Sequence, residues 1–514
     1  MNALQDQSVL VLGLGASGYA MARWAARCGA RVTVADTRAE PPQLAALREQ
    51  LPAARFVSGE FDAALLQDGV QAVLRSPGLS PGQLAPVLAA ANQRGIRMSG
   101  ELSLFAQALA DLKADKGYAP AVLAVTGTNG KTTVTALTGQ LLERAGKRTA
   151  VAGNIGPSLL ETLGAKLDGD QLPEVWVLEL SSFQLEGMEH PDPTAPAAGQ
   201  FEPTAAALLN VTQDHLDWHA TMDAYAAAKA RVFGSKALMV LNREDPLVMK
   251  MLPEPVRVKG GKMEQREHLT FGADMPQRPG DFGIEVVNGM AWLVRALEAD
   301  ETRRKRSDQA EEIHIQRLMP ADALRIRGRH NAVNALAALA LAGAAGCPLG
   351  PMLYGLREYR GEPHRVESVG TVNQVEYFDD SKGTNVGATV AALQGLGAER
   401  KLVVILGGDG KGQDFAPLAA PVARHARAAV LIGRDAPLIR AVLEPAGVML
   451  LDADSMEHAV SLATQRAHAG DAVLMSPACA SFDMFRDYPH RAQVFRAAVQ
   501  AVADEAGVQM EGNQ

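Results

Sequence analysis

Apolar residues along this chain gather in short runs, and each run is followed by a segment in which apolar positions recur every three or four residues. The runs are rich in Val, Leu and Ala and end in Gly, Asp, Asn, Ser or Thr, as in SVLVLG at 8–13 and RVTVAD at 31–36. Buried strands that alternate with amphipathic helices are typical of βαβ units around parallel sheets. The pattern therefore predicts an α/β fold.

The predicted strands form three groups along the chain. They are expected at 8–13, 31–36 and 71–78, then at 121–127, 175–182, 207–212 and 237–242, and finally at 375–381, 402–410, 429–433 and 472–477. Three groups predict three sheets, and 514 residues agree with three domains at roughly 100 to 200 residues each. We expect domains at 1–110, 111–360 and 361–514, with crossings after a helix near 99–112 and at the Gly and Pro residues near 357–365.

The pattern weakens between Pro253 and Pro320, and we expect an insertion in the central domain near 290–320. This stretch contains ETRRKRSDQAEE at 301–312, a dense run of both charge signs. Such runs are usually solvated, so a surface loop is the simplest interpretation, and a basic docking patch is the alternative.

Composition limits the partners and the compartment. The net charge is -8, which gives no overall attraction to nucleic acid or anionic lipid. Cys28, Cys347 and Cys479 lie far apart without a CxxC pair, which argues against a disulfide framework or a zinc site. The N-terminus lacks the pattern of a secretory signal, and the longest apolar run, 335–347, is too short to span a bilayer and predicts a packed helix. We expect a cytoplasmic monomer without nucleic-acid partners or membrane insertion.

The first candidate site is a glycine-rich turn after the first strand. Gly13–Gly18 fits GxGxxG, and Asp36 ends the next strand. Such glycines let the backbone approach a phosphate at a helix N-terminus, and the acid can accept ribose hydroxyls. Alone, this motif suggests a nicotinamide dehydrogenase, although any nucleotide diphosphate or a purely structural turn would use the same glycines. Asp36-Thr37-Arg38 adds a cation, and Ser76-Pro77-Gly78 adds a second tight turn.

A more specific signal is TGTNGKTT at 126–133, between an apolar strand and a predicted helix. Backbone N–H groups of such a loop cradle phosphate oxygens, Lys131 can reach the terminal phosphates, and the Thr132 hydroxyl can join a Mg²⁺ shell. The loop is a shortened GxxGKTT, since Val125 stands where the standard GxxxxGK[ST] loop begins with glycine. A structural role is the alternative.

Two further polar side chains follow strands of the second group. Glu179 ends VWVLE, and His215 follows NVTQD. Ligands of parallel sheets bind at the carboxyl ends of the strands, so both side chains could converge with Lys131 on one metal–phosphate centre. Taken alone, His215 fits a satisfied loop histidine, and Lys229 fits a solvated helix lysine.

These motifs, with others downstream, resemble those of the Mur ligase family. In family order from residue 13 to residue 485 the chain contains GLGASG with DTR, TGTNGKTT, GNIG, LELSSFQLE, NVTQDHLDWH, AAKARVF, GRHNAVNALAA, EPHRVE, FDDSKGTN, GGDGKGQDF and SPACASFDMF. The series is specific because its order and length leave little room for coincidence. Two mild departures are Gly383, where the family commonly has alanine, and Tyr488, where it can have phenylalanine.

The resemblance implies an N-terminal Rossmann-like domain for the UDP part of the substrate, a central P-loop ATPase domain with a mostly parallel sheet, and a C-terminal Rossmann-like domain that binds D-glutamate and completes the ATP site. It implies an ATP- and Mg²⁺-dependent ligase of peptidoglycan synthesis. Such an enzyme adds D-glutamate to UDP-N-acetylmuramoyl-L-alanine through an acyl phosphate.

The resemblance also carries over individual positions. Those expected at ATP are Gly127, Thr128, Asn129, Gly130, Lys131, Thr132, Thr133, Asn331, Asn334, Arg365 and Asp380. Those expected at the UDP-sugar or at D-glutamate are Ala16, Ser17, Asp36, Thr37, Arg38, Gly78, Asn154, Lys382, Thr384, Lys411, Ser481, Phe482 and Tyr488. Those expected at the metal are Thr132, Glu179, His215 and Lys229 as a carbamate, and the expected catalytic residues are Lys131, Glu179, His215 and Lys229.

Three alternatives to this function differ in what they leave unexplained. A related Mur or folylpolyglutamate-type ligase would add another amino acid, and DSKGTN, GGDGK and SPACASFD favour D-glutamate over it. A nicotinamide dehydrogenase leaves the second phosphate loop without a purpose. A non-catalytic ATP-dependent interaction protein leaves the metal-site residues idle.

Overall fold

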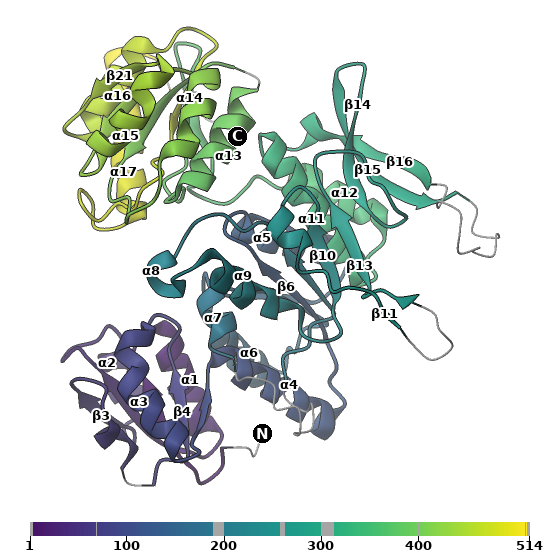
Figure 1. Cartoon of the computed structure of the whole chain (residues 1–514), viewed down its shortest axis with the longest axis vertical. Coiled ribbons are helices and arrows are strands. Elements are labelled where there is room, and N and C mark those ends of the chain that lie inside the picture. The colour runs from purple at the N-terminus through teal and green to yellow at the C-terminus, as the bar shows by residue number, and fades with distance from the viewer. Residues whose placement is uncertain are drawn as a thin grey trace.

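The computed structural model describes residues 4–67, 69–188, 200–257, 263–299, 313–398, 400–508 and 510. Three large sheets, each flanked by helices, confirm the predicted α/β fold (Figure 1). The charged run at 301–312 lies outside the described residues.

The first sheet is all parallel, in the order β3-β2-β1-β4-β5. Its strands are β1 Ser8–Leu12, β2 Arg31–Asp36, β3 Arg55–Ser58, β4 Ala72–Arg75 and β5 Arg97–Ser99. The helices are α1 Ala16–Arg27, α2 Leu44–Gln50, α3 Pro81–Gln93 and α4 Glu101–Lys116, with the short η1 Ala63–Leu66. The strand order reverses between β1 and β4, so the loops after these two strands border the crevice where doubly wound sheets bind ligands.

The second sheet has nine strands in the order β16-β15-β14-β13-β10-β9-β6-β8-β7. They are β6 Ala121–Thr126, β7 Thr149–Gly153, β8 Val175–Glu179, β9 Ala205–Leu208, β10 Leu238–Asn242, β13 His268–Phe271, β14 Phe282–Val287, β15 Met290–Glu298 and β16 Ile313–Pro320. The helices are α5 Lys131–Arg144, α6 Leu159–Asp168, α7 Ser182–Glu186, α8 Leu216–His219, α9 Met222–Ala230, α10 Pro246–Met249, α11 Arg329–Ala344 and α12 Leu349–Glu358, with short η2 Arg231–Phe233 and η3 Ala321–Ala323. A separate pair is formed by β11 Val256–Arg257 and β12 Met263–Glu264.

The region with the weak sequence pattern extends one edge of this sheet. β14, β15 and β16 pair antiparallel, whereas the strands from β7 to β14 are parallel. An edge meander is only half buried, as the 67% exposed Val286 illustrates. Its strands therefore carry a mixed apolar and polar sequence, which explains why no strand was predicted here.

The third sheet has the order β17-β18-β22-β19-β20-β21. Its strands are β17 Glu367–Val372, β18 Val375–Asp379, β19 Leu402–Gly407, β20 Ala426–Ile432, β21 Met449–Asp452 and β22 Ala472–Met475. The helices are α13 Val386–Gly397, α14 Ala419–His425, α15 Ala436–Leu443, α16 Met456–Arg466 and α17 Tyr488–Glu505, with short η4 Ala416–Leu418 and η5 Glu444–Ala446. Only β17 runs antiparallel to its neighbour.

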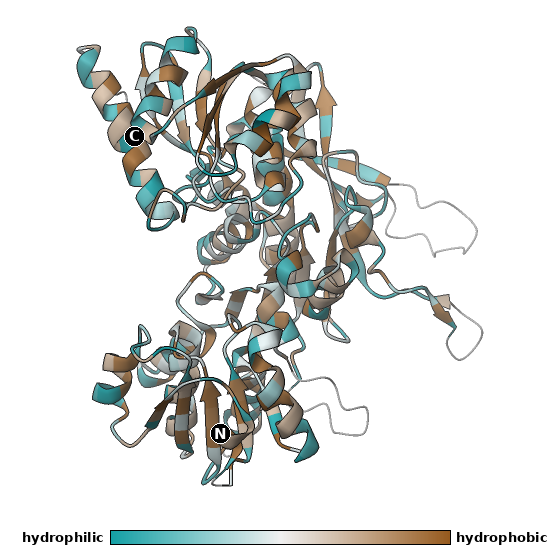
Figure 2. Ribbon diagram, turned by 60° about the vertical axis from the view of Figure 1, so that its left-hand side comes forward, coloured by the Kyte–Doolittle hydropathy of each residue, from teal (hydrophilic) through white to brown (hydrophobic). Residues whose placement is uncertain are grey.

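Each sheet is buried between helical layers, and hydrophobic strands lie at the centre of each unit (Figure 2). The run 335–342 lies in α11 and is fully buried, which confirms the predicted packed helix. One core joins the first two sheets through α4, where the Phe105 ring meets Trp176 edge-on at 5.1 Å. The expected domain boundary at 110 falls within this helix, and the domain boundaries stay predictions.

No helix among the described residues combines the length and apolar character needed to cross a membrane.

Candidate active site

The loops after β1 and β4 meet at the reversal point of the first sheet. Gly13 has a φ of +85°, which favours glycine, and Ser76 Oγ donates a hydrogen bond to the Gly13 carbonyl at 3.1 Å. A Cβ on Gly18 would lie 1.8 Å from that carbonyl oxygen, so α1 can pack here only with glycine at this position. The GxGxxG turn is thus built for close approach of backbone.

Asp36 holds this turn together. Its Oδ2 accepts the Leu14 N–H at 2.7 Å, and its two oxygens accept the Arg38 guanidinium, each at 2.8 Å. Burial would raise the pKa of Asp36, but these hydrogen bonds lower it to about 2. Ala16, Thr37 and Gly78 lie exposed around the same edge of the sheet.

Replacing this carboxylate tests its contribution to stability. Because the pKa of Asp36 in the folded protein is about 2, below its ordinary 3.8, its stabilisation is present above pH 4 and is lost as pH falls toward 2. Asp36→Asn is expected to lower the free energy of unfolding by about 1–2 kcal/mol at pH 7, since the exposed Arg38 partner is screened by solvent. Urea unfolding at pH 7 and pH 3 measures this, with exposed Glu40→Gln as control. An equal loss at both pH values would contradict the assignment.

The second phosphate loop joins β6 to α5. Gly127 and Gly130 have φ of +156° and +84°, and Gly130 caps the N-terminus of α5. Lys131 Nζ folds back on this loop, donating to the carbonyls of Gly127 at 2.9 Å and Thr128 at 2.8 Å. Thr133 is buried in the first turn of α5. A helix N-terminus behind a glycine loop is suited to bind phosphate oxygens.

Lys229 is not a solvated helix lysine. It is only 1% exposed, its Nζ donates to the same Gly127 carbonyl at 2.8 Å, and it lies 4.5 Å from the centre of the Tyr225 ring. Burial and then the nearby Lys131 charge lower the pKa of Lys229 well below its ordinary value. Burial beside the phosphate loop therefore favours the uncharged amine over the ammonium.

Glu179 and His215 border the same loop. Glu179 is buried at the end of β8, where its Oε1 accepts Asn154 Nδ2 at 3.1 Å. His215 has a φ of +54° before α8, and its ring packs on Phe183 at 4.7 Å. Burial lowers the pKa of His215, with Asp214 opposing and Lys411 adding to the effect. Glu179 also raises the pKa of Lys131, which burial otherwise lowers, so these groups share one electrostatic neighbourhood.

The segment before β17 and the loop after β18 add charged groups to this centre. Arg365 Nη2 donates to Thr132 Oγ1 at 2.5 Å. Burial raises the pKa of Asp380 to about 7, and Ser476 Oγ donates to its Oδ2 at 2.6 Å. A Cβ at Gly383 would lie 2.5 Å from this Oδ2, so the glycine leaves room for the carboxyl group.

The residues expected at D-glutamate do not all lie in one setting. Burial and then Arg365 lower the pKa of Lys382 to about 8, and its Nζ lies 5.4 Å from the centre of the Tyr488 ring. Thr384 N–H donates to the Lys382 carbonyl at 2.9 Å. In contrast, the Phe482 side chain is 73% exposed beside the buried Ser481.

Asparagine side chains join the third unit to the phosphate loop. Asn129 is one of the expected ATP contacts, whereas sequence reasoning did not single out Asn385 and Asn210. Asn385 Nδ2, at the N-cap of α13, donates to Asn129 Oδ1 and to Asp214 Oδ2, both at 3.2 Å. Asn129 N–H in turn donates to Asn210 Oδ1 at 2.8 Å. The available signal was the presence of these residues in FDDSKGTN and NVTQDH, although their pairing over 256 residues is not visible in sequence.

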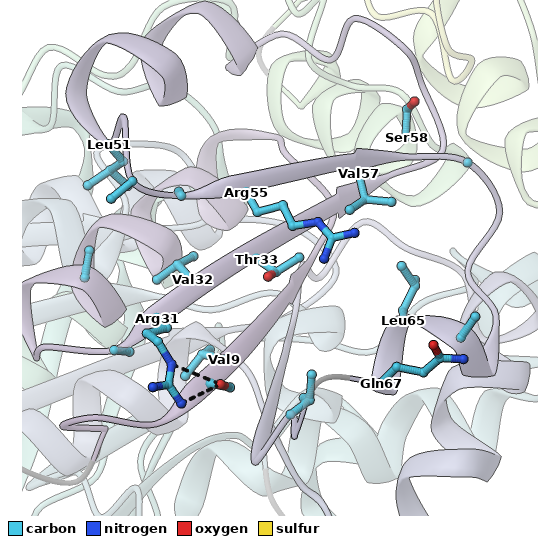
Figure 3. A pocket seen from close by; sticks show the side chains of 18 of the residues that line it. Val9, Arg31, Val32, Thr33, Leu51, Arg55, Val57, Ser58, Leu65 and Gln67 are labelled. Carbon is cyan, nitrogen blue, oxygen red and sulfur yellow. Dashed lines mark hydrogen bonds between the residues drawn. The ribbon is translucent and has the colours of Figure 1, made fainter.

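Two cavities differ in their relation to this centre. One of about 810 Å³ lies between α11 and the third unit, bordered by Asn210 and Asn334. Asn334 also approaches the phosphate loop, since a Cβ on Gly130 would lie 2.7 Å from its Oδ1, and it donates to Asn331 Oδ1. The other cavity, of about 980 Å³, lies over β1, β2 and β3 near Thr33 and Arg55 and includes none of the expected site residues (Figure 3).

Comparison with known proteins matches each of the three units to a domain of one family. The Mur ligase MurD-like N-terminal domain matches residues 7–100, the Mur ligase middle domain matches 125–342, and the Mur ligase glutamate ligase domain matches 364–479. The chain belongs to the Mur ligase family. A Mur ligase of Albidiferax ferrireducens, named UDP-N-acetylmuramoylalanine--D-glutamate ligase, is 70% identical over 513 residues, covering 100% of this chain and 99% of the relative. A Polaromonas protein of the same name is 59% identical, covering 99% of this chain and 100% of the relative.

Solved Mur ligases share the fold at low sequence identity. The MurF ligase of Thermotoga maritima in complex with ADP has a TM-score of 0.54 at 16% identity, covering 98% of this chain and 97% of that one. The UDP-N-acetylmuramate-alanine ligase of the same organism has a TM-score of 0.53 at 20% identity, covering 96% of this chain and 99% of that one. These likenesses support the three-part α/β architecture.

Proposed function

We propose that this protein is an ATP-dependent amide ligase that adds D-glutamate to UDP-N-acetylmuramoyl-L-alanine in peptidoglycan synthesis. The observation that carries the proposal is the full-length match, at 70% identity, to a relative named for this reaction. The convergence of Lys131, Glu179 and Arg365 around a glycine phosphate loop supports it, because such a centre suits phosphoryl transfer. From the use of ATP and a UDP-linked substrate we infer that the reaction takes place in the cytoplasm.

In this proposal, each predicted group of residues binds a different part of the substrates. Ser17, Asp36, Arg38 and their neighbours after β1, β2 and β4 bind the UDP moiety, with Asp36 acting through the loop that it holds. Asn154, whose Nδ2 donates to Glu179 Oε1, would contact the muramoyl part.

ATP would bind across the second and third units. The 127–133 loop would hold its phosphates, and Lys131 would exchange the loop carbonyls for phosphate oxygens once these arrive. The cavity of about 810 Å³ beside Asn210 and Asn334 is large enough for adenosine. Arg365 and Asp380 would complete the site from the third unit.

The chemistry follows from the poor reactivity of a carboxylate toward an amine. The L-alanyl carboxylate attacks the γ-phosphorus of ATP, the bond to the bridging oxygen breaks, and ADP leaves with formation of an acyl phosphate. The free amine of D-glutamate then attacks the acyl carbon, and the tetrahedral intermediate expels phosphate. Lys131 and Arg365 would stabilise the charge on the transferred phosphoryl group. Lys382 and Lys411 would pair with the carboxylates of D-glutamate.

The donor set fits Mg²⁺ on one condition. Glu179 and Thr132 offer oxygen atoms and His215 a nitrogen, while Lys229 offers an oxygen only as a carbamate. The neutral amine is the form that reacts with CO₂, and burial of Lys229 shifts its pKa in the direction that favours this form. When bound, Mg²⁺ would neutralise charge on the ATP phosphates.

The test is the substrate dependence of ADP formation by the purified protein. With UDP-N-acetylmuramoyl-L-alanine, ATP, Mg²⁺ and D-glutamate together, we expect one ADP and one phosphate for each amide formed. Omission of either UDP-N-acetylmuramoyl-L-alanine or D-glutamate should abolish the formation of ADP and phosphate. With all substrates present, mass spectrometry should show the UDP-sugar enlarged by one glutamyl residue. An unchanged rate of ADP formation without the UDP-sugar and without D-glutamate would indicate a simple ATPase and contradict the proposal.

A further inference from the structure

The strongest feature that the proposed function leaves unused is a buried carboxyl group between the first and second units. Glu101 is the first residue of α4 and is only 3% exposed. Its Oε1 accepts the Leu160 N–H at 3.1 Å, while its Oε2 is buried without a hydrogen-bond partner, as is the hydroxyl of Ser158. A buried acid is costly unless its site repays the desolvation, so this position calls for an explanation.

The surroundings of Glu101 belong to both units. Leu160 and Ser158 lie at the N-terminus of α6, and Ser17 lies in the first turn of α1, directly after the GxGxxG turn. Burial raises the pKa of Glu101, and the Leu160 N–H and the nearby Ser17 and Ser158 oppose this rise. The Glu101 carboxyl group therefore contacts the start of α6 directly, and the helix that it begins, α4, packs against α1.

Glu101 lies where three helices of the interface between the first and second units pack together. α1, α4 and α6 pack against one another, as Figure 1 shows near the first two sheets. At the other end of α1 and α6, Arg27 Nη1 meets Asp168 Oδ1 at 2.7 Å, so the two helices run side by side in the same direction. The Arg27 pair is partly exposed and contributes little. At the N-terminal end, the buried Glu101 carboxyl group binds the start of α6 through the Leu160 N–H.

Both helix starts lead directly to expected substrate contacts. Ser17 itself is expected at the UDP moiety, and Ser158 follows the 153–157 segment in which Asn154 reaches Glu179. A shift of α6 relative to α1 would therefore change the distance between the UDP-binding turn and the phosphate-transfer centre.

We propose that Glu101 is a positioning residue, which couples the UDP-binding turn at Ser17 to the 153–158 segment that carries Asn154 to Glu179. This role rests on the proposed function, since it assumes that the UDP-sugar spans the two units. A residue that only stabilised the interface between the two units would affect folding stability and leave the kinetics of the folded enzyme unchanged.

The test compares Glu101→Gln, Glu101→Asp and the wild type in full-length protein. Glu101→Gln keeps the shape but loses the charge and one acceptor, so we expect kcat/KM for the UDP-sugar to fall roughly tenfold or more, with KM for ATP unchanged. Glu101→Asp should recover part of the loss. Ser17→Ala should cost less in the Glu101→Gln background than in wild type, because coupled residues are non-additive.

Two matched controls separate this role from charge and docking. Glu161→Gln removes an exposed acid from the first turn of α6, and Arg27→Gln loosens the far end of the α1–α6 contact; both should keep wild-type KM values. A folded Glu101→Gln enzyme with wild-type kinetics, or full additivity with Ser17→Ala, would overturn the proposal. Failure of the wild type to form ADP with D-glutamate would instead reject the proposed function, and this inference with it.

Discussion

Lys131→Ala is expected to lower kcat about 100- to 1,000-fold. This is the usual effect of removing one preorganised hydrogen-bond donor that stabilises charge in a transition state. The Nζ of Lys131 lies within the phosphate loop, where it holds the Gly127 and Thr128 carbonyls that ATP phosphates would displace. Rapid measurement of ADP formation at saturating substrates reports the loss.

Binding of the UDP-sugar should survive this substitution. The GxGxxG turn and Asp36 belong to the first sheet, whereas Lys131 bonds within the loop after β6, so calorimetry should give a wild-type dissociation constant. Lys113→Ala, an exposed change on α4, is the matched control. Equal loss of UDP-sugar binding, or preferential binding of NAD at the first turn, would contradict the division into two nucleotide sites.

Lys229→Ala is expected to remove activity to a similar degree, with partial recovery on addition of short carboxylates. An ammonium at this position would repel a divalent cation and the Lys131 charge, by about 4 kcal/mol for unit charges 4 Å apart at an effective dielectric of 20. A carbamate reverses that sign, because the amine nitrogen bonds to the carbon of CO₂ and releases a proton. In the variant, a free carboxylate can supply the missing negative oxygen. Activity titrated with formate, acetate and propionate measures the recovery.

The buried setting of Lys229 makes a folding control necessary. Lys229→Met keeps the volume without a reactive nitrogen and should be folded and inactive, whereas the exposed Lys236→Ala should be fully active. Near-normal activity of Lys229→Ala, or a folded variant that ignores added carboxylate, would remove the carbamate from the account.

The parallel core of the fold could be predicted because its strands are buried on both faces. Runs such as Ala121–Thr126 and Leu402–Gly407 are almost continuously apolar and end at loops with distinct polar signatures. The same logic placed the phosphate loop at the end of β6 and Glu179 at the end of β8. The antiparallel strands β14 to β16 were missed because most of their residues are only partly buried or exposed, which breaks the continuous apolar run.

Burial and long-range pairing were the parts that sequence could not supply. In the AAAKA context Lys229 looks like a surface helix residue, and only the packing of α9 against the loop shows its side chain to be enclosed. The Asn385 contact with Asn129 and the position of Glu101 at α6 likewise join distant segments. Such contacts depend on how the units pack together, which local periodicity does not encode.

The choice of amino acid tests the central claim most directly. The measurement is ADP formation by the wild-type protein with UDP-N-acetylmuramoyl-L-alanine, ATP and Mg²⁺, in parallel reactions with D-glutamate, L-glutamate, L-lysine and meso-diaminopimelate. A D-glutamate ligase should form ADP with D-glutamate and little with the other three. Equal turnover with L-lysine or meso-diaminopimelate would contradict it.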